Sequence, residues 1–301
     1  MLKKLSELQD IVKKKQQIKR MVVAAAHDEH SLEAVSAAVK KGFVEVVLVG
    51  DEREINKIAE KNKKIDISQF EIIHEPNLSE SVAKAVKLVH YGEAEILMKG
   101  NVGTATLLKG VLNKEWGLRL NEVLSHIAVF EVQAYHHKLI SLTDVAMNIA
   151  PDLNTKIAII NNSVEFLRKL GIQTPKVAVL GAVELVNESM PATMDAALLS
   201  KMAERGQIKD CIIDGPLAFD NAISAESAKH KGIISNVAGD ADLLLLPDIE
   251  AGNVLYKSFV FFAKAKVAAV VLGARAPIVL TSRSDSEESK LDSITLAAAI
   301  A

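Results

Sequence analysis

The stretch 242-DLLLLPDIEAGNVLYKS-258 joins an unbroken run of leucines to a turn and a helical pattern. Consecutive large aliphatic residues fit a strand that is covered on both faces, as in a parallel sheet, because a strand with one wet face would alternate with polar residues. Pro247 and Asp248 mark a turn, and the apolar spacing after Gly252 is typical of an amphipathic helix. This stretch therefore predicts a strand followed at once by a helix.

The same order recurs through most of the chain. Further short runs rich in Val, Ile and Leu occupy residues 21–26, 43–50, 94–100, 176–181, 210–215 and 266–273. Helical patterns lie between them, and several end in glycine after a basic last turn, as helix C-termini prefer. Alternating strands and helices predict an α/β fold with mainly parallel sheets, which bind ligands at the carboxyl ends of their strands.

The middle of the chain departs from this order. Two apolar runs, 123–132 and 138–144, are separated by the segment QAYHH without a helix between them, which predicts a hairpin or an antiparallel insertion. A chain of 301 residues suits two domains of ordinary size. We therefore expect a second domain to begin near residue 123.

Composition excludes several classes of protein. Hydrophobic residues make up 49% and charged residues 25% of the chain, which is ordinary for a globular enzyme. The formal net charge of −2 gives no overall basic field for nucleic acid, so an anionic substrate must meet local positive charge. Since no apolar run approaches the roughly 18 residues of a membrane span and no signal-peptide core is present, we expect a cytoplasmic protein without a membrane partner.

Residues that often carry chemistry are sparse. The single cysteine, Cys211, lies in a strand-like run and is expected to be a small core residue rather than a nucleophile. The segment 27-HDEH-30 lacks zincin spacing and begins a helix, so helix capping is favoured over a metal site. Neither a P-loop nor a dinucleotide-binding glycine motif occurs, and we expect no metal.

Three loops at strand ends are candidate sites. In 96-ILMKGNVGTATLLKG-110, Lys99, Gly100 and Asn101 lie between a strand and a helix that starts near Thr104 or Thr106. A helix N-terminus, close backbone approach at glycine and a lysine together suit a phosphate or sulfonate group. The alternative is a well-capped turn without a ligand.

The other two loops follow the strands at 242–246 and 277–280. Gly252 and Asn253 lie where the chain turns after the first of these strands. Asn253 could either cap a helix or orient a carbonyl group. Ser282 and Arg283 follow the second strand, and a guanidinium fork beside a hydroxyl donor suits a phosphoryl group next to a reacting carbonyl. A plain N-cap with acidic first-turn residues is the alternative there.

These loops, read with LMKGNVGTATLL, DGPLAFDNAIS, VAGDADLLLLPDIEAGNVLYKS and TSRSDSEESK, resemble the phosphate acetyltransferase and phosphate butyryltransferase family over most of the chain, and the butyryltransferase branch most closely. The resemblance implies reversible transfer of an acyl group between coenzyme A and inorganic phosphate. It also implies a fold similar to isocitrate and isopropylmalate dehydrogenases, with two three-layer α/β domains and a cleft between them. The first domain would comprise 1–122 plus 271–301, and the second 123–270.

The resemblance further assigns roles at the third loop. Arg283 would hold the phosphoryl group, and Ser282 would donate to the oxyanion or to the leaving oxygen. In the acetyl branch an aspartate seven residues after the serine is proposed to accept the thiol proton, but that position is Ser289 here. A hydroxyl is a poor base at neutral pH, so the base stays open between Asp285, Glu288 and the phosphate itself, with Glu288 preferred.

A second departure concerns an anion contact. The arginine that follows the Tyr-Lys segment in the acetyl branch is Phe261 here, and Lys257, Lys99 or Arg275 would compensate. Loss of that charge beside apolar surface suits an acyl chain longer than acetyl, because each buried methylene contributes about 0.8 kcal/mol. Butyryl or branched acyl groups are therefore favoured.

The resemblance also implies partners. Coenzyme A would be a substrate, no cofactor would be tightly bound, and the chain would form a homodimer or a higher homo-oligomer. Within the same family the alternative activity is that of a phosphate acetyltransferase. A more distant alternative is a non-catalytic protein that binds an acyl phosphate or coenzyme A.

Overall fold

The computed structural model describes residues 2–15, 17–121, 123–135, 137–281 and 285–301. Contacts divide the chain into two compact units: the terminal unit (Ser6–Glu122 and Ala268–Ala301) and the central unit (Met1–Leu5 and Val123–Val267). The last segment of the terminal unit thus begins at residue 268, whereas the sequence-based boundary lies at 271.

The first residues belong to the central unit, although the sequence-based boundaries group them with the C-terminal segment. Two hydrogen bonds explain this. The Leu139 N–H donates to the Leu2 carbonyl oxygen over 2.9 Å, and the Leu5 N–H donates to Oε2 of Glu131 over 2.9 Å.

A mainly parallel sheet forms the middle of the terminal unit, with strand order β3-β2-β1-β4-β11-β10. Neighbouring strands are parallel except β10 and β11, which are antiparallel. The bounds are Lys19–Ala24 for β1, Val44–Gly50 for β2, Glu71–His74 for β3, Ile96–Lys99 for β4, Lys266–Leu272 for β10 and Ile278–Val279 for β11. The carboxyl ends of β1, β4 and β11 therefore lie at one edge of this sheet.

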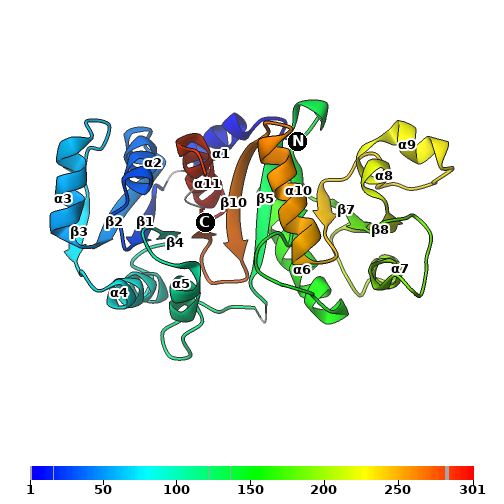
Figure 1. Cartoon of the computed structure of the whole chain (residues 1–301), viewed down its shortest axis with the longest axis horizontal. Coiled ribbons are helices and arrows are strands. Elements are labelled where there is room, and N and C mark those ends of the chain that lie inside the picture. The colour runs from blue at the N-terminus through cyan, green and yellow to red at the C-terminus, as the bar shows by residue number, and fades with distance from the viewer. Residues whose placement is uncertain (1, 16, 122, 136, 282–284) are drawn as a thin grey trace. The chain divides into compact units, whose positions relative to one another are not determined.

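Helices cover both faces of the terminal sheet (Figure 1). On one face α2 packs against α11, which also contacts α1, and on the other face α4 packs against α5, while α3 contacts β3. The bounds are Leu8–Lys14 for α1, Glu29–Lys40 for α2, Glu52–Lys61 for α3, Leu78–His90 for α4, Thr104–Val111 for α5 and Glu287–Ile300 for α11. Because helices cover both faces, all residues of β4 are buried, including Lys99.

Capping residues determine where several of these helices begin. The Asp28 carboxylate accepts from the Ser31 N–H over 2.9 Å at the start of α2, which confirms the capping role predicted for the HDEH segment. Asn77 accepts from the Ser79 N–H in the same way at the start of α4. The helix α2 ends before Gly42, whose φ of 70° lies in the left-handed region that favours glycine.

The strands of the central unit, called the central sheet below, are also mainly parallel and follow the order β5-β6-β9-β7-β8. Its strands are β5 (Ser125–Glu131), β6 (Ile140–Thr143), β7 (Lys176–Leu180), β8 (Ile212–Leu217) and β9 (Leu243–Leu245). β5 and β6 are antiparallel, which confirms the predicted hairpin, and the other neighbouring pairs are parallel. The leucine run forms β9 between β6 and β7 and is buried, as its composition predicts.

Helices also lie on both faces of the central sheet, with α6 and α7 on one face and α8 and α9 on the other (Figure 1). The bounds are Leu153–Lys169 for α6, Pro191–Glu204 for α7, Phe219–Ile223 for α8, Ala225–His230 for α9 and Ile249–Phe261 for α10. α10 packs on the antiparallel hairpin, where the rings of Phe259 and Phe130 lie 5.1 Å apart. Both units therefore have the three-layer α/β architecture that the sequence predicts.

A buried ionic cluster joins the amino ends of β6, β7 and β9. Lys138, only 1% exposed, donates from Nζ to Oδ1 of Asp242 and to the Asp240 carbonyl oxygen, both over 2.7 Å. Lys176 Nζ lies 2.5 Å from Oδ2 of Asp240. These contacts tie the starts of the three strands together, and they lie at the edge opposite to their carboxyl ends.

Candidate active site

In the terminal unit, the turns that follow β1 and β4 pack tightly against each other. The Gly100 and Asn101 N–H groups donate to the carbonyl oxygens of Ala24 and Ala25 over 2.9 and 2.7 Å. A Cβ atom at Gly100 would lie 2.4 Å from the Ala25 oxygen, so only glycine fits there. Ala25 itself has a φ of 53°, a conformation that non-glycine residues rarely adopt. Such an outlier at a strand end is a common feature of binding sites.

A serine on a neighbouring helix supports this turn. Ser81, in α4, accepts from the Ala25 N–H and donates to the Val49 carbonyl oxygen, both over 2.9 Å. The buried hydroxyl thereby pairs with the Ala25 N–H at the end of β1 and gives a second donor to the Val49 carbonyl oxygen, which also accepts from the Ala26 N–H over 3.0 Å. The conformation of the turn is consequently set before any ligand arrives.

Lys99 ends β4 and is 8% exposed. Its ammonium group donates to the carbonyl oxygens of Gly100 and Val102 over 3.2 and 3.3 Å, so it curls over the turn that follows the strand. α5 then begins at Thr104, and its N-cap, Gly103, provides no side-chain cap. A buried ammonium group beside an uncapped helix N-terminus is an arrangement that favours an anion.

The carboxyl end of the strand β11 lies at the same edge. Ile278 and Val279 pair in parallel with Leu97 and Met98, so the chain after β11 leaves the sheet beside Lys99 and Gly100. Ser282 and Arg283, the two predicted residues of the third loop, lie outside the residues that the structure describes.

The first turn of α11 holds the acidic candidate and a buried lysine. Ser286 caps α11 and accepts from the Ser289 N–H over 3.1 Å, and Glu288 is exposed in the turn that follows. Lys290 is 2% exposed and donates to the Asp285 carbonyl oxygen over 2.8 Å. The sequence did not point to Lys290, since the string SEESKLDS has the composition of a solvated helix.

In the central unit, the start of α10 packs against the end of β6. Asp248 is the N-cap of α10 and accepts from the Ala251 N–H over 2.8 Å. A Cβ atom at Gly252 would lie 2.4 Å from the Asp144 carbonyl oxygen. Asn253 donates from Nδ2 to the Val145 carbonyl oxygen over 3.4 Å, and the N-cap of α10 is Asp248 rather than Asn253.

Lys257, Phe261 and Arg275 lie away from these turns. At roughly 1.5 Å of rise per residue, Lys257 is about 12 Å and Phe261 about 18 Å from Ile249, the first residue of α10. The Lys257 side chain is exposed. Arg275 lies between β10 and β11, at the amino edge of the terminal sheet, where its N–H donates to the Leu118 carbonyl oxygen. The structure therefore does not bring Arg275 to Lys99, because the antiparallel β10 reverses the direction of the chain.

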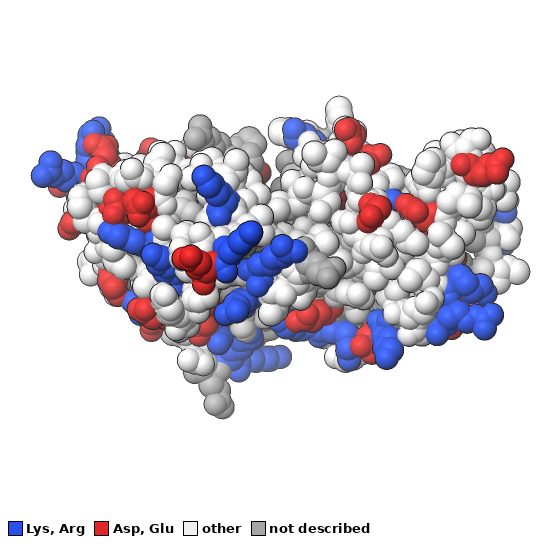
Figure 2. Space-filling model, turned by 90° about the horizontal axis from the view of Figure 1, so that it is seen from below, with Lys and Arg blue, Asp and Glu red and all other residues white. Residues whose placement is uncertain are grey.

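Local positive charge is present despite the net charge of −2. Basic side chains gather on the face of the terminal unit that carries α4 and α5 (Figure 2). Exposed basic residues of α4, α5 and the segment after them are Lys87, Lys109, Lys114 and Arg119. A face of this kind raises the local concentration of an anionic substrate.

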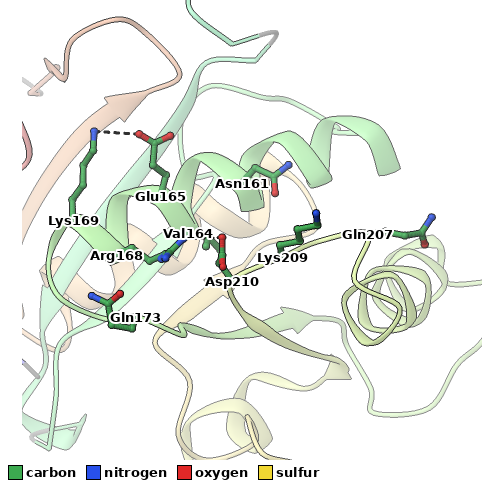
Figure 3. Close-up of a pocket in the computed structure, with 9 residues that line it drawn as sticks. All are labelled: Asn161, Val164, Glu165, Arg168, Lys169, Gln173, Gln207, Lys209 and Asp210. Atoms are coloured by element: carbon green, nitrogen blue, oxygen red, sulfur yellow. Dashed lines mark ion pairs between the residues drawn. The ribbon is translucent and has the colours of Figure 1, made fainter.

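A cavity in the central unit lies at the opposite edge of the strands from the Gly252 turn. It has a volume of about 640 Å³ and is lined by residues of α6 and by Gln173, Gln207, Lys209 and Asp210 (Figure 3). Two ion pairs neutralise much of its charge, Arg168 with Asp210 over 2.7 Å and Lys169 with Glu165 over 3.2 Å. It adjoins the amino ends of β7 and β8, opposite to the edge where parallel sheets bind ligands.

Neither a metal nor a cysteine nucleophile emerges from the described residues. Within residues 2–15, 17–121, 123–135, 137–281 and 285–301, no His, Cys, Asp and Glu side chains form a group that could hold a metal ion. Burial, followed by the charge of Asp210, raises the pKa of the Cys211 thiol to about 11. The thiol therefore stays protonated at neutral pH and is a poor nucleophile. In the same described residues, no helix has the length and apolar character needed to cross a bilayer.

Comparison with known proteins identifies the family. The family described as "Phosphate acetyl/butaryl transferase" matches residues 6–83 and 74–298, and the chain belongs to this family. It is 50% identical to the phosphate butyryltransferase of Clostridium acetobutylicum over 301 residues, which is 100% of this chain and 99% of the relative. It is 48% identical to the phosphate acetyltransferase of Thermotoga maritima over 283 residues, 94% of this chain and 95% of the relative.

Solved structures agree with the fold. A branched-chain phosphotransacylase from Enterococcus faecalis superposes with a TM-score of 0.83 at 36% identity, covering 94% of this chain and 98% of that one. The family resemblance that the loop motifs carry is therefore confirmed.

Proposed function

We propose that this chain is a phosphate acyltransferase that transfers a butyryl or branched short-chain acyl group reversibly between coenzyme A and inorganic phosphate. The observation that carries the proposal is the edge of the terminal unit where buried Lys99 and the Gly100 turn lie next to the end of β11. Family membership supplies the reaction, and this edge supplies an anion site for it.

The chemistry requires groups that stabilise negative charge. In the direction of acyl-CoA synthesis, the CoA thiolate attacks the acyl-phosphate carbonyl, an oxyanion develops, a carbon–sulfur bond forms, and the carbon–oxygen bond to phosphate breaks. In our proposal Arg283 holds the phosphoryl group and Ser282 donates to the oxyanion or to the leaving oxygen. Lys99, Gly100, Asn101 and the first turn of α5 at Thr104 add an ammonium group and backbone N–H groups at the same edge.

The proton of the thiol needs an acceptor. Ser289 is engaged in capping, since its N–H donates to Ser286 Oγ over 3.1 Å and the two hydroxyl oxygens lie 3.0 Å apart. We therefore propose the neighbouring Glu288, which is exposed in the first turn of α11, as the general base.

In the central unit we propose Gly252 and Asn253 as substrate-binding residues, because they follow the carboxyl end of β9. Lys257 is proposed as a more distant contact for the phosphates of coenzyme A. Arg275 is not included, because it lies at the opposite edge of its sheet from Lys99.

A phosphate acetyltransferase is the second candidate, and its support is the 48% identity to the Thermotoga maritima enzyme. The proposed substrates are cytoplasmic metabolites, and we place the enzyme in the cytoplasm, in short-chain fatty acid metabolism. We also propose a homodimer, for which light scattering after size exclusion would give the mass.

The test is phosphate-dependent release of CoA thiol from acetyl-, propionyl-, butyryl-, isobutyryl- and isovaleryl-CoA, read with a thiol-reactive dye and with phosphate omitted as the control. We expect the highest kcat/KM with butyryl-CoA or a branched substrate. Faster release from acetyl-CoA would keep the family and replace the proposal by the second candidate. No phosphate-dependent release from any substrate would reject both enzymes and favour a binding protein.

A further inference from the structure

Ser81 is an unusual residue for its place in α4. It is 0% exposed and its neighbours in the helix, Val82 and Ala85, are buried and apolar, so an alanine would serve the packing of α4 equally well. A serine inside a helix usually faces water or donates to the carbonyl oxygen four residues earlier, as Ser163 does to Ile159 over 2.8 Å. The Ser81 hydroxyl instead bonds to backbone groups at the end of the sheet, which indicates a role other than packing.

This hydroxyl group holds a residue in an uncommon conformation. Ser81 Oγ accepts from the Ala25 N–H over 2.9 Å, and the φ of Ala25 is 53°. A residue with a side chain persists in this left-handed region where surrounding groups fix its backbone. The Ala25 carbonyl oxygen accepts from the Asn101 N–H over 2.7 Å. Ser81 and the turn after β4 therefore fix the two polar backbone groups of Ala25 from opposite sides.

Ala25 in turn determines where the turn after β4 lies. Gly100 packs so closely on Ala25 that a Cβ atom there would be 2.4 Å from the Ala25 oxygen, and the Gly100 N–H donates to the Ala24 carbonyl oxygen over 2.9 Å. The Lys99 ammonium group donates to the Gly100 carbonyl oxygen over 3.2 Å. A chain of close contacts thus runs from the Ser81 hydroxyl through Ala25 and Gly100 to the ammonium group of Lys99.

We propose that Ser81 is a positioning residue for phosphate: it holds Ala25 in the left-handed conformation and thereby fixes the turn that presents Lys99 to the anion. The inference rests on the proposed function, since it explains how the anion site of the terminal unit keeps its shape. Because Ser81 is completely buried, it acts through the turn and not by contact with the substrate.

The first test compares the KM for phosphate with the KM for butyryl-CoA in the full-length enzyme. In Ser81→Ala we expect the KM for phosphate to rise about tenfold, because a small displacement of a binding group is costly, and the KM for butyryl-CoA to stay nearly constant. Ser81→Cys keeps the volume but is a weak donor and acceptor, so it should lie between Ser81→Ala and the wild type. Ser163→Ala removes an equally buried hydroxyl from α6 and should leave both KM values unchanged.

A second readout does not depend on turnover. Inorganic phosphate raises the thermal unfolding midpoint of a protein that binds it in the folded state. At one phosphate concentration we expect this rise to be smaller in Ser81→Ala than in Ser163→Ala. In a Lys99→Met background, Ser81→Ala should change the KM for phosphate less than twofold, because two residues that act through one contact are not additive.

An unchanged KM for phosphate together with an unchanged phosphate-induced rise of the midpoint in Ser81→Ala would overturn the inference. Equal increases in both KM values, or a full tenfold effect in the Lys99→Met background, would also overturn it, because Ser81 would then support the fold without acting through Lys99. Should Ser81→Ala fail to fold, Ser81→Cys provides the same comparisons. Absence of phosphate-dependent thiol release in the wild type would reject the proposed function, whereas the midpoint measurement would still test the role of Ser81 in phosphate binding.

Discussion

The side chains at the carboxyl ends of the strands differ between the two units, although the strands of both units have a similar arrangement. In the terminal unit the edge consists of small residues, Ala24, Ala25 and Gly100, around the buried ammonium group of Lys99. In the central unit the loops at the corresponding edge present exposed aliphatic side chains, Ile149 among them. The strands of each unit are mainly parallel with one antiparallel pair, so the direction of the strands does not explain the difference between the two edges. The difference between the two edges therefore lies in the loops that follow the strands.

The amino edge of the central sheet differs from both, because it serves stability. Replacing Lys138 by Met leaves the Asp242 carboxylate, 2% exposed, without its ammonium partner. Loss of one partner of a buried pair typically costs about 3–5 kcal/mol, and we expect that loss in the free energy of unfolding measured in urea. Lys201→Met, which removes an exposed pair with Glu204, is the control and should cost about 1 kcal/mol or less. A loss of that small size in Lys138→Met would show that this cluster does not stabilise the unit.

The assignment of anion chemistry to the terminal edge predicts a large effect at Arg283. Loss of a donor to transition-state charge typically lowers turnover by about 100- to 1,000-fold, and we expect such a fall in Arg283→Ala with the thermal unfolding midpoint unchanged. Ser282→Ala should behave in the same way. Turnover close to that of the wild type in both variants would remove the loop after β11 from the site.

The proposed base is tested by a matched pair on one helix turn. Glu288→Gln should lower turnover by about 100-fold, because general-base help is usually worth at least that much. Glu287→Gln changes the adjacent first-turn carboxylate and should leave turnover nearly unchanged. Equal effects in both would indicate a general effect of charge at the start of α11.

Lys99 should matter for phosphate more than for acyl-CoA. In Lys99→Met we expect kcat/KM for phosphate to fall about 10- to 100-fold, since a charge-assisted contact to the anion is lost. Lys201→Met, in the exposed ion pair with Glu204 of the central unit, serves as the control. A larger effect on the KM for acyl-CoA than on that for phosphate would contradict the assignment of anion binding to this edge.

The smallest effect concerns acid stability. Burial by itself would raise the pKa of Asp240, but hydrogen bonds from Lys176 and Lys138 outweigh burial and lower this pKa to about 2. The stability that this lowered pKa provides is complete above the unfolded value of about 4 and is lost as the pH falls toward 2. Asp240→Asn should therefore flatten the dependence of unfolding free energy on pH in this window, and an unchanged slope would contradict it.

Much of the fold was predictable because buried strands have a composition of their own. The leucine run and the other apolar runs became strands, and the QAYHH segment became the connection of an antiparallel pair. β3 was missed because EIIH is short, flanked by charged residues and only half-buried. Its strand character comes from pairing with β2, which is a tertiary contact.

The site was predictable where a turn has local requirements and not where distant residues meet. The Gly100 turn follows from its sequence, but the partner of Asn253 is Val145, more than a hundred residues away. Arg275 was misplaced because the direction of the chain around β11 depends on its antiparallel pairing with β10. The burial of Lys290 was not predictable either, because composition does not report which side of a helix is covered.

The close approach of Gly252 to the Asp144 carbonyl has a consequence for protein engineering. Any side chain at position 252 would push the start of α10 away from the end of β6, since even a Cβ atom would lie 2.4 Å from that oxygen. A mutant library at this edge of the central unit should therefore keep this glycine and vary the exposed positions of the neighbouring loops. Ile149, Leu185 and Val186 tolerate such variation because their side chains already face water.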